Sequence, residues 1–421
     1  LHFVKRHLAL LPLAVMLIVG VSLLTPVQVR RLSLLGFACC LALLVLTLLV
    51  GPEIKGARRW IGIAGFSLQA SEFVKPTFAL VTAWLLSEQA RDPRFPGMPI
   101  AVAAFAIVIS LVLAQPDLGQ TVVITTVWMA QIFLAGIPLW LVFGGIIAAI
   151  AGLAGAYLLL PHVTSRIDRF LDPSSGDTYQ IDRSLEAFNN GGLFGRGPGE
   201  GVVKNYLPDA HADFVFAVAG EEFGVVVCLI IVCLFAFVVL RGFARALQEN
   251  SLFALLAVSG LMTQFGLQAL INMGSSLQLM PTKGMTLPFI SYGGSSLLAI
   301  GLGLGMALAL TRRWRRGMSG GRSIMIAAGG TGGHIFPAVA LAQALCARGH
   351  GVAFVTDARG AAIGAEQLGL PEGASCHTVP AGRIGGGLLQ SMRGGMDIIA
   401  GTLAARRLIR RLGPSVAVGF G

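Results

Sequence analysis

The chain has 421 residues, of which 55% are hydrophobic and only 12% are charged, and its formal net charge is +11. So little charge cannot cover the surface of a soluble globule of this size, and the composition also excludes a disordered tail and a disulfide-stapled secreted module. We therefore expect most of the chain to lie in lipid, with the excess positive charge in cytoplasmic loops and no nucleic acid as partner.

Nine apolar stretches reach the length of about 17–25 residues that a membrane-spanning helix needs. They lie at about 8–25, 33–51, 72–88, 98–115, 118–136, 138–160, 214–240, 252–273 and 286–311. Arginine pairs such as Arg30/Arg31 and Arg91/Arg94 follow the odd-numbered stretches. Because positive loops favour the cytoplasm, we expect the N-terminus of this chain outside and its C-terminal tail inside.

After Arg316 the composition changes to a soluble α/β pattern. Strands are expected at 323–328, 352–356 and 415–421, with a helix at 335–348 between the first two. The fold prediction is therefore a mainly α, polytopic helical membrane domain at 1–316, a linker at 317–322, and a partial Rossmann-like α/β domain with a parallel sheet at 323–421.

Cations gather in the predicted external loop before the third span, beside an aromatic residue. They are Lys55, Arg58 and Arg59, and the aromatic residue is Trp60. Guanidinium and ammonium groups suit a polyanionic head group such as a pyrophosphate. The alternative is interfacial snorkelling of long cationic side chains next to an aromatic anchor.

Polar residues also open two of the predicted spans. Glu72 and Lys75 begin the third span, where their i, i+3 spacing equally allows a local ion pair. Asp117 begins the fifth span and suits either a helix N-cap or contact with a ligand or ion.

Residues 176–224 combine an amphipathic segment at 179–188, a glycine-dense loop at 191–201, and Asp213 directly before an apolar helix. A carboxylate held at the membrane rim and partly desolvated can serve as a general base, although Asp213 could instead cap the helix. Glu221 and Glu222 lie two turns into that helix, where charge is costly, so we expect them to face a polar cavity.

The last predicted external loop carries Lys283, Pro288, Ser291 and Tyr292, followed by a Gly-Gly pair at 293–294. The proline and the glycines should break or kink the helix. Broken helices at membrane depth usually line a cavity.

A glycine turn in the tail follows a predicted strand and opens a helix, the setting in which backbone N–H groups hold a phosphate. Its residues are Gly330, Thr331, Gly332, Gly333 and His334. The turn does not spell GxGxxG, which disfavours a dinucleotide fold. The six cysteines show no CxxC spacing, so we expect no disulfide framework and no cysteine metal site.

These segments together resemble two families. Residues 1–316 resemble the FtsW/RodA class, the SEDS glycosyltransferases that polymerise lipid II into peptidoglycan, through GARRW, QPDLGQT, PDAHADFVFAVAGEEFG and LPFISYGGSS. The PTKG at 281–284 is more similar to the division branch, FtsW, than to the elongation branch, RodA. Residues 318–421 resemble the N-terminal part of MurG, which adds GlcNAc to lipid I, through GGTGGHIFPAVALAQAL and VAVGFG.

The resemblance implies a site for lipid II polymerisation. Asp213 would take the proton from the 4-hydroxyl of the acceptor GlcNAc as that oxygen attacks the anomeric carbon of the donor MurNAc. Cations would face the pyrophosphate leaving group, aided by a divalent cation such as Mg²⁺. The residues expected to bind substrate are Arg58, Arg59, Glu72, Lys75, Asp117, Lys283, Ser291 and Tyr292, and His334 would lie near the lipid I diphosphate in the tail.

The resemblance also implies a place and partners. The protein is expected in the bacterial cytoplasmic (inner) membrane, with lipid II as substrate and with a class B penicillin-binding protein and other division proteins as partners. The SEDS pattern has ten helices and MurG has a second half that binds UDP-GlcNAc, so we expect a fusion of neighbouring reading frames that is cut at both ends.

Three alternatives remain open at this point. A lipid II flippase would use a membrane cavity, but no inverted repeat is visible and the polar residues crowd one face. A division scaffold would need only interaction surfaces. A MurG-type transferase is disfavoured because glycosyl transfer needs both substrates in one cleft.

Overall fold

The structure is a computed structural model, which describes residues 2–53, 56–63, 66–136, 139–159, 161–172, 179–281, 284–312, 324–329, 332–361, 369–371, 374–382 and 388–420. The chain divides into two compact units, Leu1–Arg312 and Arg313–Gly421.

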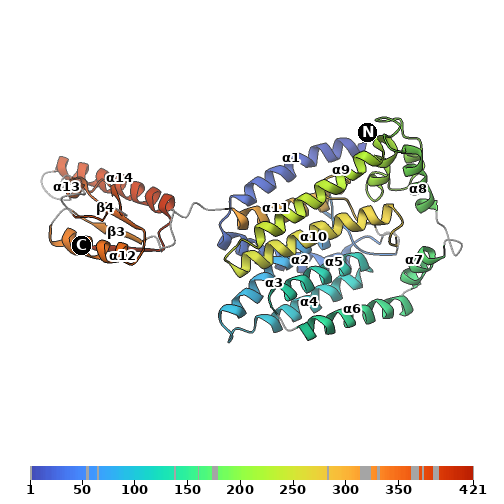
Figure 1. Cartoon of the computed structure of the whole chain (residues 1–421), viewed down its shortest axis with the longest axis horizontal. Coiled ribbons are helices and arrows are strands. Elements are labelled where there is room, and N and C mark those ends of the chain that lie inside the picture. The colour runs from blue at the N-terminus through green and yellow to red at the C-terminus, as the bar shows by residue number, and fades with distance from the viewer. Residues whose placement is uncertain are drawn as a thin grey trace. The chain divides into compact units, whose positions relative to one another are not determined.

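Long helices that run side by side make up the first unit (Figure 1). They overlap the predicted spans one by one: α1 (His2–Ser22), α2 (Pro26–Val50), α3 (Ala70–Arg91), α4 (Gly97–Ala114), α5 (Leu118–Leu134), α6 (Leu139–Leu159), α9 (Val215–Ala246), α10 (Leu252–Ser276) and α11 (Gly294–Thr311). In the described part of the chain, six helices are long and apolar enough to cross a membrane, namely α1, α2, α4, α9, α10 and α11. The predicted class of a helical, polytopic membrane protein is confirmed.

Helices α3 and α10 form the core of this unit. The spanning part of α10 is 72% buried, whereas that of α9 is only 11% buried. Helix α10 packs against α3, α5, α9 and α11. Polar side chains on α3 and α10 are therefore shielded inside the bundle, while α9 presents apolar side chains to the surroundings.

Two predicted spans have different limits in the structure. The span predicted at 286–311 becomes helical only at Gly294, because residues 284–293 form an irregular loop with a turn at 288–290. The span predicted at 214–240 extends to Ala246 and is broken at Gly224, which has φ 77° and ψ −178°. Only glycine adopts this backbone conformation readily, so Gly224 fixes the place of the break.

Shorter elements connect the long helices. Strands β1 (Ile61–Ile63) and β2 (Phe66–Leu68) form an antiparallel hairpin between α2 and α3. Helices α7 (Pro161–Leu171) and α8 (Tyr179–Gly191) and the short 3-10 helix Val203–Asn205 lie between α6 and α9. Helix α8 confirms the predicted amphipathic segment at 179–188, and it packs on α9.

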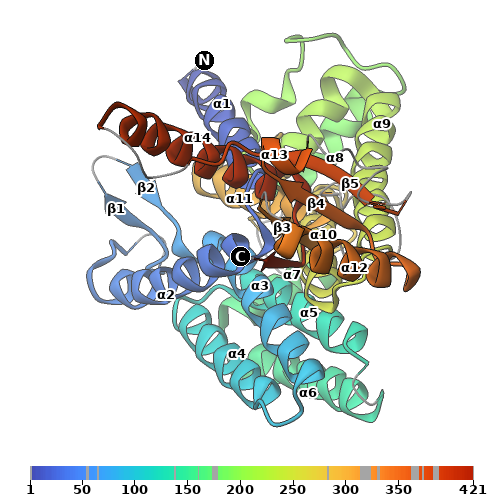
Figure 2. The same ribbon diagram turned by 90° about the vertical axis from the view of Figure 1, so that its left-hand side faces the viewer.

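The second unit is a parallel sheet with helices on both sides (Figure 1, Figure 2). Its elements are β3 (Ile324–Ala328), α12 (Gly332–Ala347), β4 (Val352–Thr356), α13 (Ala358–Ala361), β5 (Ala374–Thr378), α14 (Leu388–Leu412) and β6 (Val416–Phe420). The strand order is β5-β4-β3-β6, and all three pairings are parallel. The predicted βαβ start is confirmed, although α12 begins at 332 and not at 335.

Candidate functional site

Asp213 lies at the end of the loop before α9, and this loop is bonded to the loop before α11. The Ser291 hydroxyl donates a hydrogen bond to the main-chain carbonyl of Ala212 at 2.5 Å. The Ser291 hydroxyl oxygen in turn accepts a hydrogen bond from the Leu287 N–H at 2.7 Å. Ser291 is buried, so it fixes both loops from the inside.

A second tie comes from Asn272 on α10, a fully buried residue. Its amide nitrogen donates to the main-chain carbonyl of Asp213 at 2.9 Å and to that of Met285 at 2.6 Å. The Tyr292 N–H also donates to the His211 carbonyl at 2.9 Å. The structure therefore brings three of the predicted residues, Asp213, Ser291 and Tyr292, into one cluster.

The Asp213 carboxylate faces Gly284, the last residue of the PTKG segment. A Cβ atom placed on Gly284 would lie 2.8 Å from the Asp213 Oδ2 atom. Asp213 itself is half-buried. A side chain at position 284 would therefore collide with the Asp213 carboxylate in its present position.

Glu72 and Lys75 form an ion pair inside the bundle, which is the local pairing that the sequence left open. The Lys75 Nζ atom lies 2.9 Å from Glu72 Oε2 and donates to the Gln268 side-chain oxygen at 3.2 Å. The Gln120 amide donates to the second oxygen of Glu72. Lys75 is only 2% exposed and Glu72 6%, and a buried pair of this kind is tolerated because each charge has further hydrogen bonds.

This buried network reaches the Asp213 cluster through α10. The Gln268 amide donates to the Ser296 hydroxyl at 3.0 Å and to the Thr286 carbonyl at 3.3 Å. Gln268 and Asn272 are four residues apart and so lie on one face of the helix. The two amides bind neighbouring residues, Thr286 and Met285, and hold the loop 284–293 against the bundle.

Arg59 and Asp117 each form hydrogen bonds at the junction of α4 and α5. The Arg59 guanidinium donates to the carbonyls of Gln115 at 3.0 Å and Pro116 at 2.5 Å. Asp117 is the N-cap of α5 and accepts from the Gln120 N–H at 3.4 Å. The capping role that the sequence allowed for Asp117 is observed, and Arg59 is bonded to main-chain atoms.

Arg58 is exposed, lies 3.7 Å from the Glu53 carboxylate, and donates to the Leu48 carbonyl at 3.4 Å. Lys55 and Lys283 lie outside the described residues.

The expectation that Glu221 and Glu222 face a polar cavity is wrong. Glu221 has no exposed surface, and its carboxylate accepts hydrogen bonds from the N–H groups of Val202, Val203 and Lys204 at 2.8, 2.9 and 3.1 Å. Glu222 forms an ion pair with the Lys204 ammonium group. Both carboxylates thus bind residues 202–204, which directly follow the glycine-dense loop at 191–201.

The glycine-dense loop at 191–201 packs against α9 at the break in that helix. The Gly197 N–H donates to the Glu222 carbonyl at 2.9 Å, a carbonyl released by the break. A Cβ atom on Gly224 would lie 2.3 Å from the Leu193 carbonyl oxygen, and one on Gly195 would lie 2.2 Å from that of Glu222. The glycines are therefore required because two stretches of main chain are in direct contact.

In the second unit, Gly332, Gly333 and His334 form the first turn of α12, which is the next described element after β3, and His334 is exposed. Gly330 and Thr331 lie outside the described residues. The turn thus lies between a parallel strand and a helix, as expected, and phosphate binding there stays a prediction.

Sequence reasoning missed Asn272 and Gln268. A signal existed, because each is an uncharged polar residue inside a predicted apolar span, and polar residues inside spans are usually functional or paired. Their partners on the 284–293 loop could not be read from the sequence.

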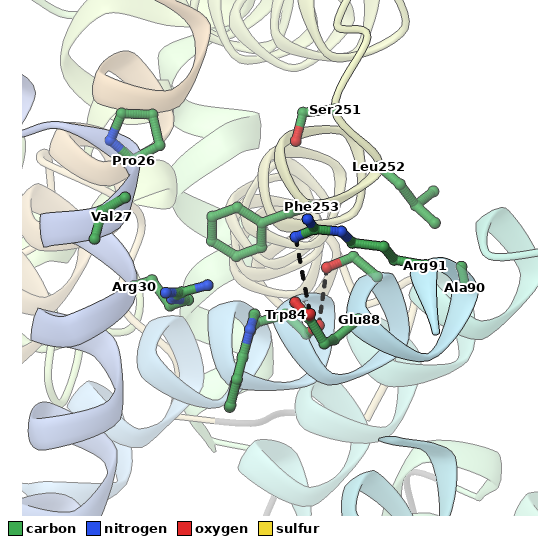
Figure 3. Close-up of a pocket in the computed structure, with 11 residues that line it drawn as sticks. Pro26, Val27, Arg30, Trp84, Glu88, Ala90, Arg91, Ser251, Leu252 and Phe253 are labelled. Carbon is green, nitrogen blue, oxygen red and sulfur yellow. Dashed lines mark hydrogen bonds and ion pairs between the residues drawn. The ribbon is translucent and has the colours of Figure 1, made fainter. Parts of the chain in front are cut away.

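A cavity of about 440 Å³ lies where α2 and α10 begin and α3 ends (Figure 3). Arg30, Trp84, Glu88, Arg91 and Phe253 are among its lining residues, and none of the predicted site residues is. Arg30 stacks on Trp84 at 5.5 Å from the ring centroid, and Arg91 lies 4.0 Å from Glu88. This cavity is separate from the Asp213 cluster.

Comparison with known proteins gives matches for both units. Residues 1–316 match the FtsW/RodA/SpoVE family model, described as a cell cycle protein. Residues 324–421 match the glycosyltransferase family 28 N-terminal domain. The predicted resemblance of both parts is confirmed.

The relatives include a protein of Caulobacter vibrioides named "Probable peptidoglycan glycosyltransferase FtsW", which is 45% identical over 314 residues, or 74% of this chain and 80% of the relative. A protein of the same name from Coxiella burnetii is 39% identical and covers 73% of this chain and 86% of the relative.

Two solved structures are similar at 29% sequence identity. One is a chain of a peptidoglycan synthase complex that coordinates polymerization and crosslinking, with a TM-score of 0.63 over 74% of this chain and 90% of the other. The second is the rod shape determining protein RodA of Thermus thermophilus, with a TM-score of 0.56 over 74% and 88%. The chain therefore belongs to the FtsW/RodA/SpoVE family of cell cycle proteins.

Proposed function

We propose that the membrane unit is a peptidoglycan glycosyltransferase that polymerises lipid II during cell division, with Asp213 as the general base. Relatives that share most of its length are named peptidoglycan glycosyltransferases. The observation that carries the choice of base is the double tie of the Asp213 loop, through Ser291 to the Ala212 carbonyl and through Asn272 to the Asp213 carbonyl.

These two ties orient the carboxylate through main-chain atoms. In the proposed reaction the 4-hydroxyl oxygen of the acceptor GlcNAc bonds to the anomeric carbon of the donor MurNAc, and its proton passes to the Asp213 carboxylate. The bond between that carbon and the pyrophosphate oxygen breaks at the same time, and undecaprenyl pyrophosphate leaves with the electron pair. A rigid carboxylate contributes by being correctly placed before the proton moves.

The leaving pyrophosphate needs positive charge near it. Lys75 is already paired with Glu72 inside the bundle, and Arg59 is bonded to two carbonyls. Of the proposed cations, we therefore assign direct contact first to exposed Arg58 and to Lys283, because Gly284, the chain neighbour of Lys283, lies against Asp213. Glu72, Lys75, Asp117, Ser291 and Tyr292 would shape the site from within.

A divalent cation such as Mg²⁺ belongs to the proposal as a companion of the substrate pyrophosphate. The described residues contain no group of three His, Cys, Asp or Glu side chains that could hold a metal ion.

The site is proposed to face the outside of the bacterial cytoplasmic membrane, with the N-terminus of this chain outside and the α/β unit inside. The arginine-rich loops support this orientation through the positive-inside rule. A class B penicillin-binding protein is the proposed partner, and support comes from the similar structure, which is part of a peptidoglycan synthase complex.

The test is polymerisation of labelled lipid II by the purified full chain with Mg²⁺ and a class B penicillin-binding protein. We expect Asp213→Asn to slow glycan formation at least about 100-fold, the usual size of a lost general base, with an unchanged thermal unfolding midpoint. The matched control is Asp209→Asn on the same loop. Asp209 is exposed and has φ 53°, a conformation that asparagine also tolerates, so its substitution should leave the rate within about twofold.

Polymerisation by Asp213→Asn at the wild-type rate would remove Asp213 from its role. If neither the wild type nor Asp213→Asn formed glycan strands, but both moved labelled lipid II across the membrane of proteoliposomes, a flippase would replace the polymerase.

A further inference from the structure

A second cavity with arginines at its rim lies far from Asp213. It has a volume of about 520 Å³ and lies between α9, α10 and α11, with Ser22 at the end of α1. Its arginines are Arg241, Arg245 and Arg312. Asp213 lies just before α9 and Arg245 lies in its last turn. The part of this helix after the break at Gly224, residues 225–246, alone rises about 33 Å at about 1.5 Å per residue. The cavity thus lies at the opposite end of the membrane unit from the proposed active site.

The wall of this cavity is apolar. Its apolar residues are Phe237, Val238, Val258, Met262, Leu304, Ala307 and Leu308. Phe237 is 65% exposed and Leu308 51% exposed, so both project from the bundle into the space where lipid chains lie. Gly242 allows α9 to approach α10, since a Cβ atom there would lie 2.2 Å from the Met262 sulfur. The result is an apolar groove that ends at a group of arginines.

Two of these arginines, Arg241 and Arg245, have no acidic partner among the residues that the structure describes. Arg241 and Arg245 are four residues apart on one face of α9, where like charges repel each other. The cavity of Figure 3 differs, because there Arg91 lies 4.0 Å from Glu88 and Arg30 stacks on Trp84.

We propose that this groove binds an anionic glycerophospholipid, with its phosphate at Arg241 and Arg245 and an acyl chain along the apolar wall. One guanidinium group can donate two parallel hydrogen bonds to two oxygens of a phosphate. Basic pockets between membrane helices are suited to anionic head groups. A soluble anion would gain nothing from the apolar wall. A partner's apolar helix would leave the two arginines without counter-charge. The site is distinct from that of the lipid-linked substrate, so it stands or falls independently of the proposed reaction.

The experiment is native mass spectrometry of the detergent-solubilised full chain, titrated with phosphatidylglycerol or with phosphatidylcholine of the same acyl chains. Wild-type protein should bind phosphatidylglycerol more tightly. Arg241→Gln combined with Arg245→Gln should weaken that binding about 10- to 30-fold, since each basic residue near an anionic lipid contributes about a factor of five. Binding of phosphatidylcholine should change less than about twofold, because it carries no net charge.

The matched control is Arg30→Gln combined with Arg91→Gln, which removes two arginines from the cavity of Figure 3 and should change phosphatidylglycerol binding less than about threefold. A separate variant, Leu308→Trp, fills the apolar wall and should weaken both lipids. Equal loss in the two arginine pairs, equal binding of both lipids by the wild type, or full binding by Leu308→Trp would each overturn the proposal. Thermal unfolding midpoints compared with the wild type show that the variants remain folded.

Discussion

Two acidic residues of the same stretch of chain, Asp213 and Glu221, have opposite surroundings. Around Asp213, side chains of α10 and of the 284–293 loop bind main-chain carbonyls, and the carboxylate is half-buried against Gly284. Around Glu221, the carboxylate itself accepts three main-chain N–H groups and has no exposed surface.

The difference shows what separates a structural acid from a candidate general base. The Glu221 oxygens are occupied by three main-chain N–H groups, which would lose their acceptor if this carboxylate turned toward a substrate. Glu221 therefore stabilises the junction of the glycine segment with α9. Asp213 lies eight residues earlier and is positioned by bonds to its neighbours, so its role can be chemical.

The largest effect is expected from a substitution that pushes the glycine-dense loop at 191–201 away from α9. Gly224→Ala should destabilise the protein by about 3 kcal/mol or more, because it adds backbone strain and a clash 2.3 Å from the Leu193 carbonyl. Thermal unfolding in detergent measures the loss. The control is Gly199→Ala, where φ is +86° but no atom lies within 4 Å, and the expected loss is about 1–2 kcal/mol. Equal losses would mean that contact with the segment is not what requires the glycine.

Glu221→Gln tests the structural acid directly. The amide keeps one acceptor oxygen for three N–H donors and loses the charge, so we expect a loss of stability of about 2–3 kcal/mol. Glu222→Gln, which removes only a partly exposed ion pair with Lys204, should cost about 1 kcal/mol or less. The ratio of the two shifts in unfolding midpoint is the measurement, and similar shifts would contradict the assignment of Glu221 as the main tie.

Asn272→Ala tests whether the Asp213 loop depends on its tie to α10. We expect kcat for lipid II polymerisation to fall about 10- to 100-fold with little change in KM, because a misplaced catalytic group loses rate more than binding. Ser275→Ala is the control, since its hydroxyl bonds only to the Asn272 carbonyl within the same helix. A rise in KM at constant kcat would show that Asn272 shapes substrate binding and does not position the base.

The smallest change in stability is expected for a substitution of Arg59. Its charged group is hydrogen-bonded to main-chain atoms, as is that of Glu221. Arg59→Lys cannot reproduce the fork that binds two carbonyls, and it should lower stability by about 1 kcal/mol. Arg58→Lys, at an exposed site, should have no measurable effect on stability. A lower polymerisation rate in Arg58→Lys alone would support its proposed contact with the pyrophosphate.

The sequence was sufficient for the positions of the membrane helices, because long apolar runs have few alternatives. It also identified the segments that carry Asp213, Ser291 and Tyr292, since polar motifs interrupt apolar runs there. The spacing of Glu72 and Lys75 allowed the observed ion pair. Their shared contacts with Gln120 and Gln268 depend on how α3, α5 and α10 pack together, and no local pattern contains that information.

Glu221 shows the limit of such reasoning most clearly. Charge inside an apolar run pointed to a polar cavity, but the donors that satisfy the carboxylate come from residues 17–19 positions earlier. They reach it only because the glycine segment folds into the break in α9. A break in a helix cannot be located from an apolar pattern that continues through it.

The break at Gly224 also limits how much of α9 can cross the hydrocarbon layer of a membrane as one straight helix. Residues 225–246 of α9 rise about 33 Å, close to the hydrocarbon thickness of about 30 Å, and Leu229 and Leu240 are 58% and 68% exposed, as lipid-facing side chains are. Residues 215–223 then extend beyond the hydrocarbon by up to about 14 Å. In the proposed reaction, Asp213 would therefore act at the level of the lipid head groups, where the pyrophosphate of a lipid-anchored sugar is expected.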